Sequence, residues 1–453
     1  MEDIVQDDTP HSITLTIVLA RGQARQLLTN KEGALSTVTL RIPLFDSWWL
    51  DALSINRAVH EQIGLRGTLL RCLNVGRNPS TNQWTGTVLV ESQDPGWALS
   101  DDLALVPFNL TPGSSDGERP VLYGGGEAAP WTRPGWFGEA SDWMLAQLES
   151  LGIKVEGEIE QVRAWFLSCI MRVATSEGEY YLKAVPSAFR HEPPLTLDLS
   201  MHHPGFVPDV VAVDVERHWT LMRNVPGVKL AQHPDKALYL PRWAELLRRF
   251  AQVQIEYTSR VDDLLAMGCF DFRLERLYTD AEALFAEAPH LLEGSNGLSA
   301  EQVTLLPRLL PRLRALCDAL KGSGIPPTLH HGDFHSGNIL CEEDCVVLDW
   351  SGHVGVSHPF LFLSVVSEEH TYEVVLDQLV GVYLSAWSAH GLPNVLMEYA
   401  RMGIGLGWLT GALGHSRQIA MAADPWEREQ EQGNLEYCLK TLLRILSDGA
   451  QVA

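Results

Sequence analysis

The sequence predicts an α+β fold in which a β-rich first part is followed by a larger, mainly helical part. Three observations support this class. Residues 13–19 alternate between aliphatic side chains and mostly threonine, which is the period of a strand with one face more buried than the other. Residues 243–257 place large apolar side chains at helical spacing. Residues 111–135, between these regions, are rich in proline and glycine, which break both helices and strands.

The first part of the chain contains further strand patterns. Residues 67–75 and 84–91 are strand-like runs, and turn-forming residues occupy positions 77–82 between them. We therefore expect a long hairpin there, preceded by a helix at about residues 54–63.

The breaker-rich segment determines the predicted domain organisation. It separates a β-rich N-terminal domain, residues 1–128, from a region that begins near residue 136. That region is predicted to contain a helix at 140–151 and strands near 165–173, 180–185, 210–215 and 220–222. Helical patterns follow from about residue 241, with further helices near 301–320, 371–388, 396–413 and 427–447. We therefore expect a small β-rich lobe at 136–230 and a helical lobe at 231–453.

The composition excludes several classes of protein. The 453 residues include 34 Lys and Arg against 57 Asp and Glu, a formal net charge of −23. Such a surface would be repelled by nucleic-acid phosphates and by anionic lipids, so we expect neither partner. No apolar stretch approaches the roughly 20 residues that span a bilayer. The longest, residues 402–414, is short and glycine-rich and is predicted to be a buried helix.

The cysteines and the N-terminus indicate a cytoplasmic protein. Seven cysteines are scattered along the chain, and the close pair Cys341 and Cys345 has no second pair to complete a zinc site. We therefore expect reduced thiols. The acidic start, MEDIVQDD, lacks the basic-then-apolar pattern of a secretory signal. The oligomeric state does not follow from the sequence.

The most informative segment is LHHGDFHSGN at residues 329–338. Asp333 and Asn338 are five positions apart, and Asp349 follows eleven residues later, after the apolar run 346–348. Protein kinases place an Asp and an Asn at this spacing in the catalytic loop, and another Asp at the end of a later strand. The pattern therefore indicates phosphoryl transfer.

The chemistry of that reaction explains these residue types. It requires a carboxylate beside the acceptor hydroxyl and oxygen ligands for the hard Mg²⁺ ions that bridge the phosphates. We expect Asp333 to orient the hydroxyl and take its proton, and Asn338 and Asp349 to hold the metal. Each residue alone is more often a turn or capping residue, so the prediction depends on the joint pattern, which also includes His331 and His335.

With these motifs the sequence resembles the aminoglycoside phosphotransferase and choline kinase family of small-molecule kinases. The signature of this family is His-Gly-Asp-x-His-x-x-Asn, followed by a strand that ends in Asp-Trp or a similar pair. The resemblance covers about residues 136–450 and implies a protein-kinase-like, two-lobed fold that binds ATP and Mg²⁺ between its lobes. By the match, Asp333 is the catalytic base, and Asn338 and Asp349 are magnesium ligands. His331 and His335 are loop-shaping residues or simply packing ones.

The upstream half contains candidates for the nucleotide site. Lys183, in the strand-like segment 179–185, corresponds to the lysine that reaches the α- and β-phosphates, and Glu192 to the glutamate that fixes it. Alone, a strand lysine is more often a solvated edge residue. Glu216 competes with Glu192 for the pairing.

A glycine-rich G-x-G-x-x-G loop is absent from the sequence at the expected place. Residues 160–169 stand there instead, and by the resemblance Ser168 is the candidate for contacting the phosphates. Residues 222–227 are expected to form the interlobe hinge, where the backbone around Asn224 would meet the adenine.

One departure from the family pattern supports a second hypothesis. The family commonly has a Gly-Asp-Pro-like turn after the metal-binding Asp and a further Asp that braces the loop, but residues 355–362, GVSHPFLF, contain no acid. The alternative is a catalytically inactive, nucleotide-binding regulator of the same fold. A third hypothesis, a zinc hydrolase using His330, His331 and His335, lacks the expected His-Glu-x-x-His helix.

The N-terminal domain has a weaker resemblance. Residues 57–65, RAVHEQIGL, are similar to the end of the Nudix-hydrolase box, but Ala58 and Gln62 occupy two of its acidic positions and leave Glu61. The resemblance implies a degenerate Nudix-like fold used for binding rather than hydrolysis. The alternative is an ordinary amphipathic helix in an unrelated β-rich domain.

The acceptor is expected to be a small hydroxylated molecule. The charge of −23 would attract a cationic acceptor such as an aminoglycoside or a choline-like amine, although solubility explains the same charge. A sugar-like acceptor is equally open. Candidate acceptor-binding residues in the helical lobe are Asp271, Arg273, Glu275 and the segment 424–427.

Overall fold

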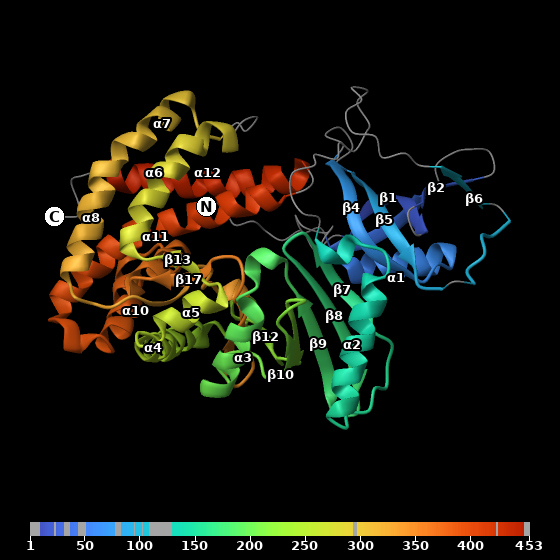
Figure 1. Cartoon of the computed structure of the whole chain (residues 1–453), viewed down its shortest axis with the longest axis horizontal. Helices are drawn as coiled ribbons and strands as arrows, with labels where there is room; N and C mark the ends of the chain where they lie inside the picture. Colours follow the sequence, from blue (N-terminus) through green and yellow to red (C-terminus); the bar gives the residue numbers. More distant parts are fainter. Residues whose placement is uncertain are drawn as a thin grey trace. The chain divides into compact units, whose positions relative to one another are not determined.

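The computed structural model divides the chain into two compact units, which are described separately. The first unit comprises Met1–Pro186 and Met421–Arg428, and the second comprises Ser187–Ala420 and Glu429–Ala453. The structure describes residues 10–21, 24–30, 37–43, 51–77, 83–94, 96–101, 103–107, 129–292, 297–422 and 425–447. Figure 1 labels many of their helices and strands.

A six-stranded sheet forms the N-terminal part of the first unit. Its strands are β1 (Pro10–Arg21), β2 (Ala24–Asn30), β3 (Thr37–Pro43), β4 (Gly67–Arg77), β5 (Trp84–Ser92) and β6 (Leu103–Pro107). They are arranged in the order β4-β5-β1-β2-β6, and β3 also pairs with β1. The pairing of β1 with β5 is parallel, and β4 and β5 form the predicted antiparallel hairpin. The turn within 78–82 lies outside the described residues.

The alternation that predicted β1 corresponds to its buried face. Ile13, Leu15, Ile17 and Leu19 are at most 1% exposed and pack against helix α1 (Ala52–Ile63) in one apolar cluster. The helix begins where the Asp51 side chain accepts a hydrogen bond from the amide of Ser54 at 3.0 Å. It ends at Gly64, whose φ of 67° is the left-handed conformation that glycine adopts readily.

The Nudix-like segment lies on this helix, and its polar side chains have structural partners. Gln62 bonds to strand β3 twice, because its Oε1 accepts from the amide of Thr39 at 3.0 Å and its Nε2 donates to the carbonyl of Thr39 at 2.7 Å. Arg57 forms an ion pair with Glu160 at 2.9 Å. Glu61 is exposed. The first unit therefore uses Gln62 to hold the helix to the sheet, and the Nudix-like resemblance stays a prediction.

The rest of the first unit contains helix α2 (Trp136–Ser150) and three neighbouring strands that pair antiparallel (Figure 1). These are β7 (Glu160–Trp165), β8 (Ser168–Thr175) and β9 (Gly178–Ala184). Gln161 joins β7 to β4, since its side chain is 3% exposed and bonds to both the amide and the carbonyl of Leu69.

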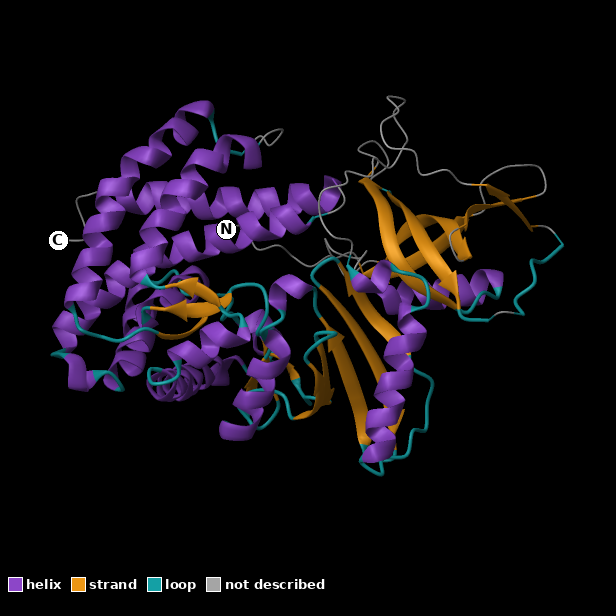
Figure 2. Ribbon diagram, in the orientation of Figure 1, coloured by secondary structure: helices purple, strands orange, loops and turns teal. Residues whose placement is uncertain are grey.

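The second unit is mainly helical, as Figure 2 shows. Its helices are α3 (Glu192–His202), α4 (Tyr239–Tyr257), α5 (Val261–Met267), α6 (Leu274–Leu291), α7 (Ala300–Leu305), α8 (Leu310–Gly322), α9 (Leu363–Glu369), α10 (Glu373–Ser385), α11 (Pro393–Met421) and α12 (Pro425–Ser447). Most of the predicted helical segments are confirmed, and the predicted buried segment 402–414 is part of α11. Helices α5, α6 and α9 were not predicted.

The second unit also contains short strands, and the connections between some of them contain the candidate site residues. They are β10 (Val210–Asp214), β11 (Trp219–Arg223), β12 (Val228–Lys229), β13 (Phe270–Phe272), β14 (Thr328–His331), β15 (Ile339–Cys341), β16 (Cys345–Val347) and β17 (Val354–Ser357). They form a β10–β11 hairpin and two three-stranded sheets, β12-β15-β16 and β13-β17-β14. The α+β class predicted from the sequence is confirmed.

No helix in the described part of the chain is long and apolar enough to cross a membrane. The predicted three-part division of the chain, at 1–128, 136–230 and 231–453, stays a prediction.

Candidate active site

The predicted catalytic loop connects two of these sheets. Strand β14 ends at His331, and strand β15 begins at Ile339, so that Asp333 and Asn338 lie between them. The loop starts at Gly332, whose amide donates to the carbonyl of His353 at 3.2 Å. A Cβ at position 332 would lie 2.7 Å from that carbonyl oxygen, closer than side chains normally approach. Glycine is therefore required where the loop passes residue 353.

Asp333 and Asn338 are joined directly. The side-chain nitrogen of Asn338 donates to Asp333 Oδ2 at 2.7 Å and to the Asp333 carbonyl at 3.1 Å. A short 3-10 turn, Ser336–Asn338, brings the two residues together. The side-chain nitrogen of Asn338 makes both bonds to Asp333, so the side-chain oxygen, the atom that can bind Mg²⁺, takes no part in this contact.

His335 stabilises the ionised form of Asp333. Its Nε2 lies 3.5 Å from Asp333 Oδ1, and its Nδ1 accepts from the amide of Gly337 at 3.0 Å. Burial favours the neutral form of Asp333, but the contact with His335 outweighs it and lowers the pKa of Asp333 well below its usual range. Burial also opposes the charge on His335, yet Asp333 raises the pKa of His335 above its usual value. Asp333 is therefore an ionised carboxylate near neutral pH.

His331 connects the loop to the segment that contains Asp349. Its Nε2 donates to the carbonyl of Leu348 at 3.1 Å, and its Nδ1 accepts from the amide of Asp333 at 3.3 Å. The ring is fully buried, 4.5 Å from the ring of Trp350 between centroids, and burial lowers its pKa. His331 is thus a neutral residue with both nitrogens bonded.

Asp349 adopts an unusual backbone conformation. Its φ is 60°, in the left-handed region that side chains other than glycine, Asn and Asp rarely occupy. Ser351 Oγ donates to Asp349 Oδ1 at 2.5 Å, and the carbonyl of Ser351 accepts from His191 Nε2 at 2.9 Å. Such conformations persist where the surrounding structure holds them, often at functional sites. Here His191 at the start of α3 and the hydroxyl of Ser351 hold the segment.

A cluster of buried aromatic rings packs against Phe334 of the loop. Phe334 is fully buried between Asp333 and His335, and its ring stacks on Phe250 of α4 at 4.9 Å between centroids. Trp243 and Phe362 also contact it, at 5.9 and 5.8 Å. Burial of these rings fixes the position of the loop, since each aromatic side chain removes a large apolar area from water.

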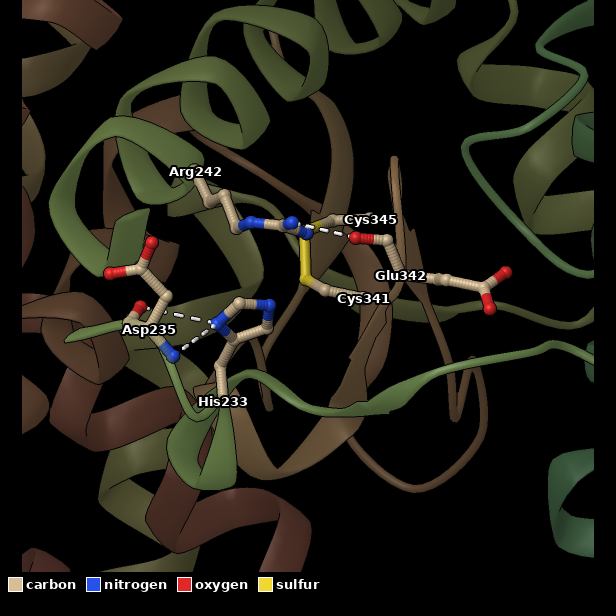
Figure 3. The surroundings of a disulfide bond; sticks show 6 residues. All are labelled: His233, Asp235, Arg242, Cys341, Glu342 and Cys345. Atoms are coloured by element: carbon tan, nitrogen blue, oxygen red, sulfur yellow. Dashed lines mark hydrogen bonds between the residues drawn. A yellow bond between two sulfur atoms is a disulfide. The ribbon is translucent and has the colours of Figure 1, made fainter. Parts of the chain in front are cut away.

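A disulfide bond closes the hairpin between Asn338 and Asp349. Cys341 and Cys345 are opposite one another in β15 and β16 and are bonded, so the prediction that they are reduced thiols is wrong. Figure 3 shows Arg242 beside this bond, where it donates to Cys345 Sγ at 3.4 Å and to the Glu342 carbonyl at 2.6 Å. Arg242 thus ties helix α4 to the hairpin.

The other five cysteines are buried thiols, as predicted, and three of them have shifted pKa values. Cys169, Cys269 and Cys317 are buried, and burial raises the pKa of each to about 12. They are therefore protonated and unreactive near neutral pH.

The nucleotide-binding candidates are divided between the two units. Ser168 follows the two-residue turn of the β7–β8 hairpin, opposite Trp165, and Lys183 lies on β9 on the face opposite buried Tyr180 and Leu182. Both belong to the first unit. Their predicted contacts with the phosphates of the nucleotide therefore stay predictions.

The other two candidates belong to the second unit. Glu192 is the first residue of α3 and is 5% exposed, so the helix start predicted at Pro193-Pro194 is confirmed. Asn224 is exposed, in the connection between β11 and β12. Glu216, the competing acid, is exposed in the β10–β11 turn. The pairing of Lys183 with Glu192 stays a prediction.

The histidines needed for a zinc hydrolase have other partners. His330 is 1% exposed, bonds to Ser357 Oγ through Nδ1 at 3.1 Å, and has its pKa lowered by burial to about 3. Within the described ranges, no group of three or more His, Cys, Asp or Glu side chains could hold a metal ion.

The acceptor candidates Asp271 and Arg273 bond to each other at 2.7 Å, and Asp424 lies outside the described residues.

Comparisons with known proteins agree with the motif. Residues 170–361 match the family model described as the phosphotransferase enzyme family, so the predicted resemblance is confirmed over this region. No curated protein matches the chain.

Several solved structures are similar. A choline/ethanolamine kinase family protein from Mesorhizobium loti is 17% identical and covers 69% of this chain and 98% of its own, with a TM-score of 0.46. The choline kinase LicA from Streptococcus pneumoniae is 13% identical, with 68% and 99% covered and a TM-score of 0.46. The aminoglycoside 2'-phosphotransferase-IIIa is 14% identical, with 68% and 98% covered and a TM-score of 0.42.

Proposed function

We propose that this chain, whose residues 170–361 match the phosphotransferase enzyme family, transfers the γ-phosphate of ATP to a hydroxyl group of a small molecule, with Mg²⁺ as the metal. The observation that carries the proposal is the direct bond between Asn338 and the ionised carboxylate of Asp333, on a loop connected through His331 to the segment of Asp349. This arrangement offers a proton acceptor and oxygen ligands within one small region.

In this proposal Asp333 acts on the acceptor. Its carboxylate accepts a hydrogen bond from the hydroxyl and takes the proton as the hydroxyl oxygen bonds to the γ-phosphorus, while the bond to ADP breaks. A carboxylate whose pKa is held low by His335 is fully ionised and available for this bond, although it is a weak base. Orientation of the acceptor is therefore its main contribution.

The residues fit a magnesium ion. The amide nitrogen of Asn338 is used on Asp333, so its oxygen can serve as a ligand, and Asp349 adds a carboxylate. Bound there, Mg²⁺ would neutralise the negative charge of the phosphates. Lys183, fixed by Glu192, would bind the α- and β-phosphates. Ser168 would contact the phosphates from the hairpin turn, and the backbone around Asn224 would meet the adenine.

The acceptor is proposed to be aminoglycoside-, choline- or sugar-like. A cationic acceptor would be attracted by the net charge of −23. We place the reaction in the cytoplasm, where ATP is supplied.

A screen for ADP release tests the proposal. The wild-type protein with ATP and Mg²⁺ is incubated with a library of amino alcohols, sugars and aminoglycosides, and each positive acceptor is repeated with Asp333→Asn. We expect ADP release with at least one acceptor class, lowered by about 100-fold or more in the variant. ATP binding by calorimetry without turnover on any acceptor would instead favour the inactive regulator. Equal turnover by Asp333→Asn would exclude the role given to Asp333.

A further inference from the structure

An acid far along the chain contacts the loop that carries Asp333 and Asn338. Glu369 is the last residue of helix α9, and its Oε2 accepts a hydrogen bond from the backbone amide of Ser336 at 2.8 Å. Its other oxygen, Oε1, accepts from the hydroxyl of Tyr239 at 2.5 Å. One carboxylate therefore joins the loop to the first residue of helix α4.

The place of Ser336 gives this contact its importance. Ser336 lies between Asp333 and Asn338 in sequence and is 5% exposed, so its amide is removed from water. The bonds from Asn338 to Asp333 and from Gly337 to His335 run within the loop itself. Backbone bonds of Gly332 with His353 and of Asn338 with Leu348 hold the two ends of the loop, so the middle, at Ser336, is where Glu369 adds a contact from outside. Bonds inside a loop shape it but do not place it against the rest of the protein. Glu369 acts from outside and fixes the polar side of the loop, while Phe334 fixes its apolar side.

The residues directly after Asp349 are engaged elsewhere. Residues 355–362 contain no acid, and Ser357 and His358 in this segment bond to His330 and to the amide of Phe360. The acid that reaches the loop comes seven residues beyond this segment, at 369.

We propose that Glu369 is the positioning residue of the catalytic loop, holding Ser336 so that Asp333 and Asn338 keep their relative geometry. This inference rests on the proposed function, because the loop is catalytic only if the chain transfers phosphate. Glu369 itself touches no reacting atom and acts through Ser336. The inference accounts for a loop that is held in place although residues 355–362 lack an acid.

The chemistry of the contact suits a carboxylate. An ionised carboxylate only accepts, and here both of its partners donate. Burial and the neighbouring Glu369 raise the pKa of Tyr239 to about 12, so its hydroxyl keeps its proton near neutral pH. A glutamine could accept from Ser336 through its oxygen and donate to Tyr239, whose hydroxyl can also accept. An alanine would leave the buried amide of Ser336 without this acceptor.

Hydrogen–deuterium exchange tests the tether without requiring turnover. The full chain is compared with Glu369→Ala, Glu369→Gln and Tyr239→Phe, with Glu373→Gln as a matched control on an exposed acid four residues away. In Glu369→Ala we expect the amide of Ser336 to exchange about tenfold faster, while peptides from helix α8 are unchanged. Glu369→Gln should restore most of the protection, Tyr239→Phe should have a smaller effect than alanine, and the control should match the wild type.

Steady-state kinetics with an acceptor found by the screen then test positioning. We expect Glu369→Ala to lower kcat by about 10- to 100-fold with KM for ATP nearly unchanged, and Glu369→Gln to recover much of the loss. Unchanged exchange at Ser336, or a higher KM for ATP with normal kcat, would overturn the inference. A wild-type protein that releases no ADP would count against the proposed function alone, because the exchange result still decides whether Glu369 holds the loop.

Discussion

Asn338 donates a hydrogen bond of 2.7 Å from its side-chain nitrogen to the carboxylate of Asp333. Asn338 therefore combines two proposed roles, orienting Asp333 and binding the metal, of which the sequence predicted only the second. The bond orients the proposed proton acceptor, and it leaves the side-chain oxygen of Asn338 available for the proposed metal. The order of the two residues in the loop and the short turn between them make this bond possible.

Replacing Asn338 should disturb both roles. We expect Asn338→Ala to lower turnover by about 100-fold, because Asp333 loses the bond that orients it, and to require a higher Mg²⁺ concentration for half-maximal rate. ADP release measured across a Mg²⁺ titration checks this. Asn394→Ala, an exposed asparagine in the first turn of α11, is the matched control and should behave as wild type. A variant with normal turnover and normal Mg²⁺ dependence would contradict the assignment.

Because Asp349 has a left-handed backbone conformation, we expect two substitutions at this position to differ in stability although both lose activity. Asparagine tolerates the left-handed region nearly as well as aspartate, whereas alanine is strained there by roughly 1 kcal/mol. We therefore expect Asp349→Asn to keep the unfolding free energy and Asp349→Ala to lower it by about 1 kcal/mol. Both should lose turnover, since neither supplies a carboxylate to the metal. Denaturant unfolding together with the ADP assay measures the two effects. Equal stability of the two variants would contradict the strain argument.

The Cys341–Cys345 bond should stabilise the hairpin that joins Asn338 to Asp349. Closing a loop this short stabilises a protein by about 2 kcal/mol in the chain-entropy model, and we expect dithiothreitol to lower the unfolding free energy by about this amount. The double variant Cys341→Ala/Cys345→Ala is the control, because the reductant should have no further effect on it. If reduction leaves the wild-type stability unchanged, the bond contributes nothing to folding.

His415 predicts a pH dependence of stability. Its Nδ1 contacts Glu431 Oε2 at 2.9 Å, and Glu431 is 1% exposed. Burial favours neutral His415, but contacts with Cys438 and Glu431 outweigh it and raise its pKa to about 10. The unfolded value is about 6.5. The stabilisation is therefore complete below about pH 6.5 and is lost as the pH rises toward 10.

Unfolding of His415→Gln across this pH range measures the contribution. We expect a loss of about 3 kcal/mol relative to wild type at pH 6, shrinking steadily toward pH 10. The exposed His390 gives a matched control, His390→Gln, which should show no such trend. A difference that does not change with pH would show that His415 stabilises the protein by packing alone.

In the first unit, restoring an acid of the Nudix-like box should weaken the fold. Gln62→Glu replaces the nitrogen that donates to the Thr39 carbonyl with a second acceptor, so we expect a loss of about 0.5–1 kcal/mol. Glu61→Gln on the exposed side of the same helix is the control. Higher stability of Gln62→Glu in denaturant unfolding would contradict the structural role of Gln62.

The features that the sequence predicted well are those with a local pattern. The alternation at residues 13–19 and the spacing at 243–257 identify their elements because burial repeats with the period of the backbone. The spacing of Asp333, Asn338 and Asp349 predicted a shared site because the three residues are close in sequence, joined by one loop and one hairpin.

Two of the features that escaped prediction depend on contacts between residues that are far apart in the sequence. Glu369 is 33 residues from Ser336, and no local pattern connects a helix end to a loop amide. The contact of Gly332 with the carbonyl of His353 is equally invisible in the sequence, although a glycine before Asp333 was part of the motif. The Cys341–Cys345 bond was readable in principle, because a hairpin register places these residues opposite one another.

We propose that Asn338 and Asp349 hold the metal of a nucleotide beside Asp333. The most direct measurement is a crystal structure with a non-hydrolysable ATP analogue and Mn²⁺, in which anomalous scattering locates the ion. We expect a manganese peak within bonding distance of Asn338 Oδ1 and the Asp349 carboxylate. A peak bound only by other residues, or a nucleotide seated away from these two side chains, would contradict it.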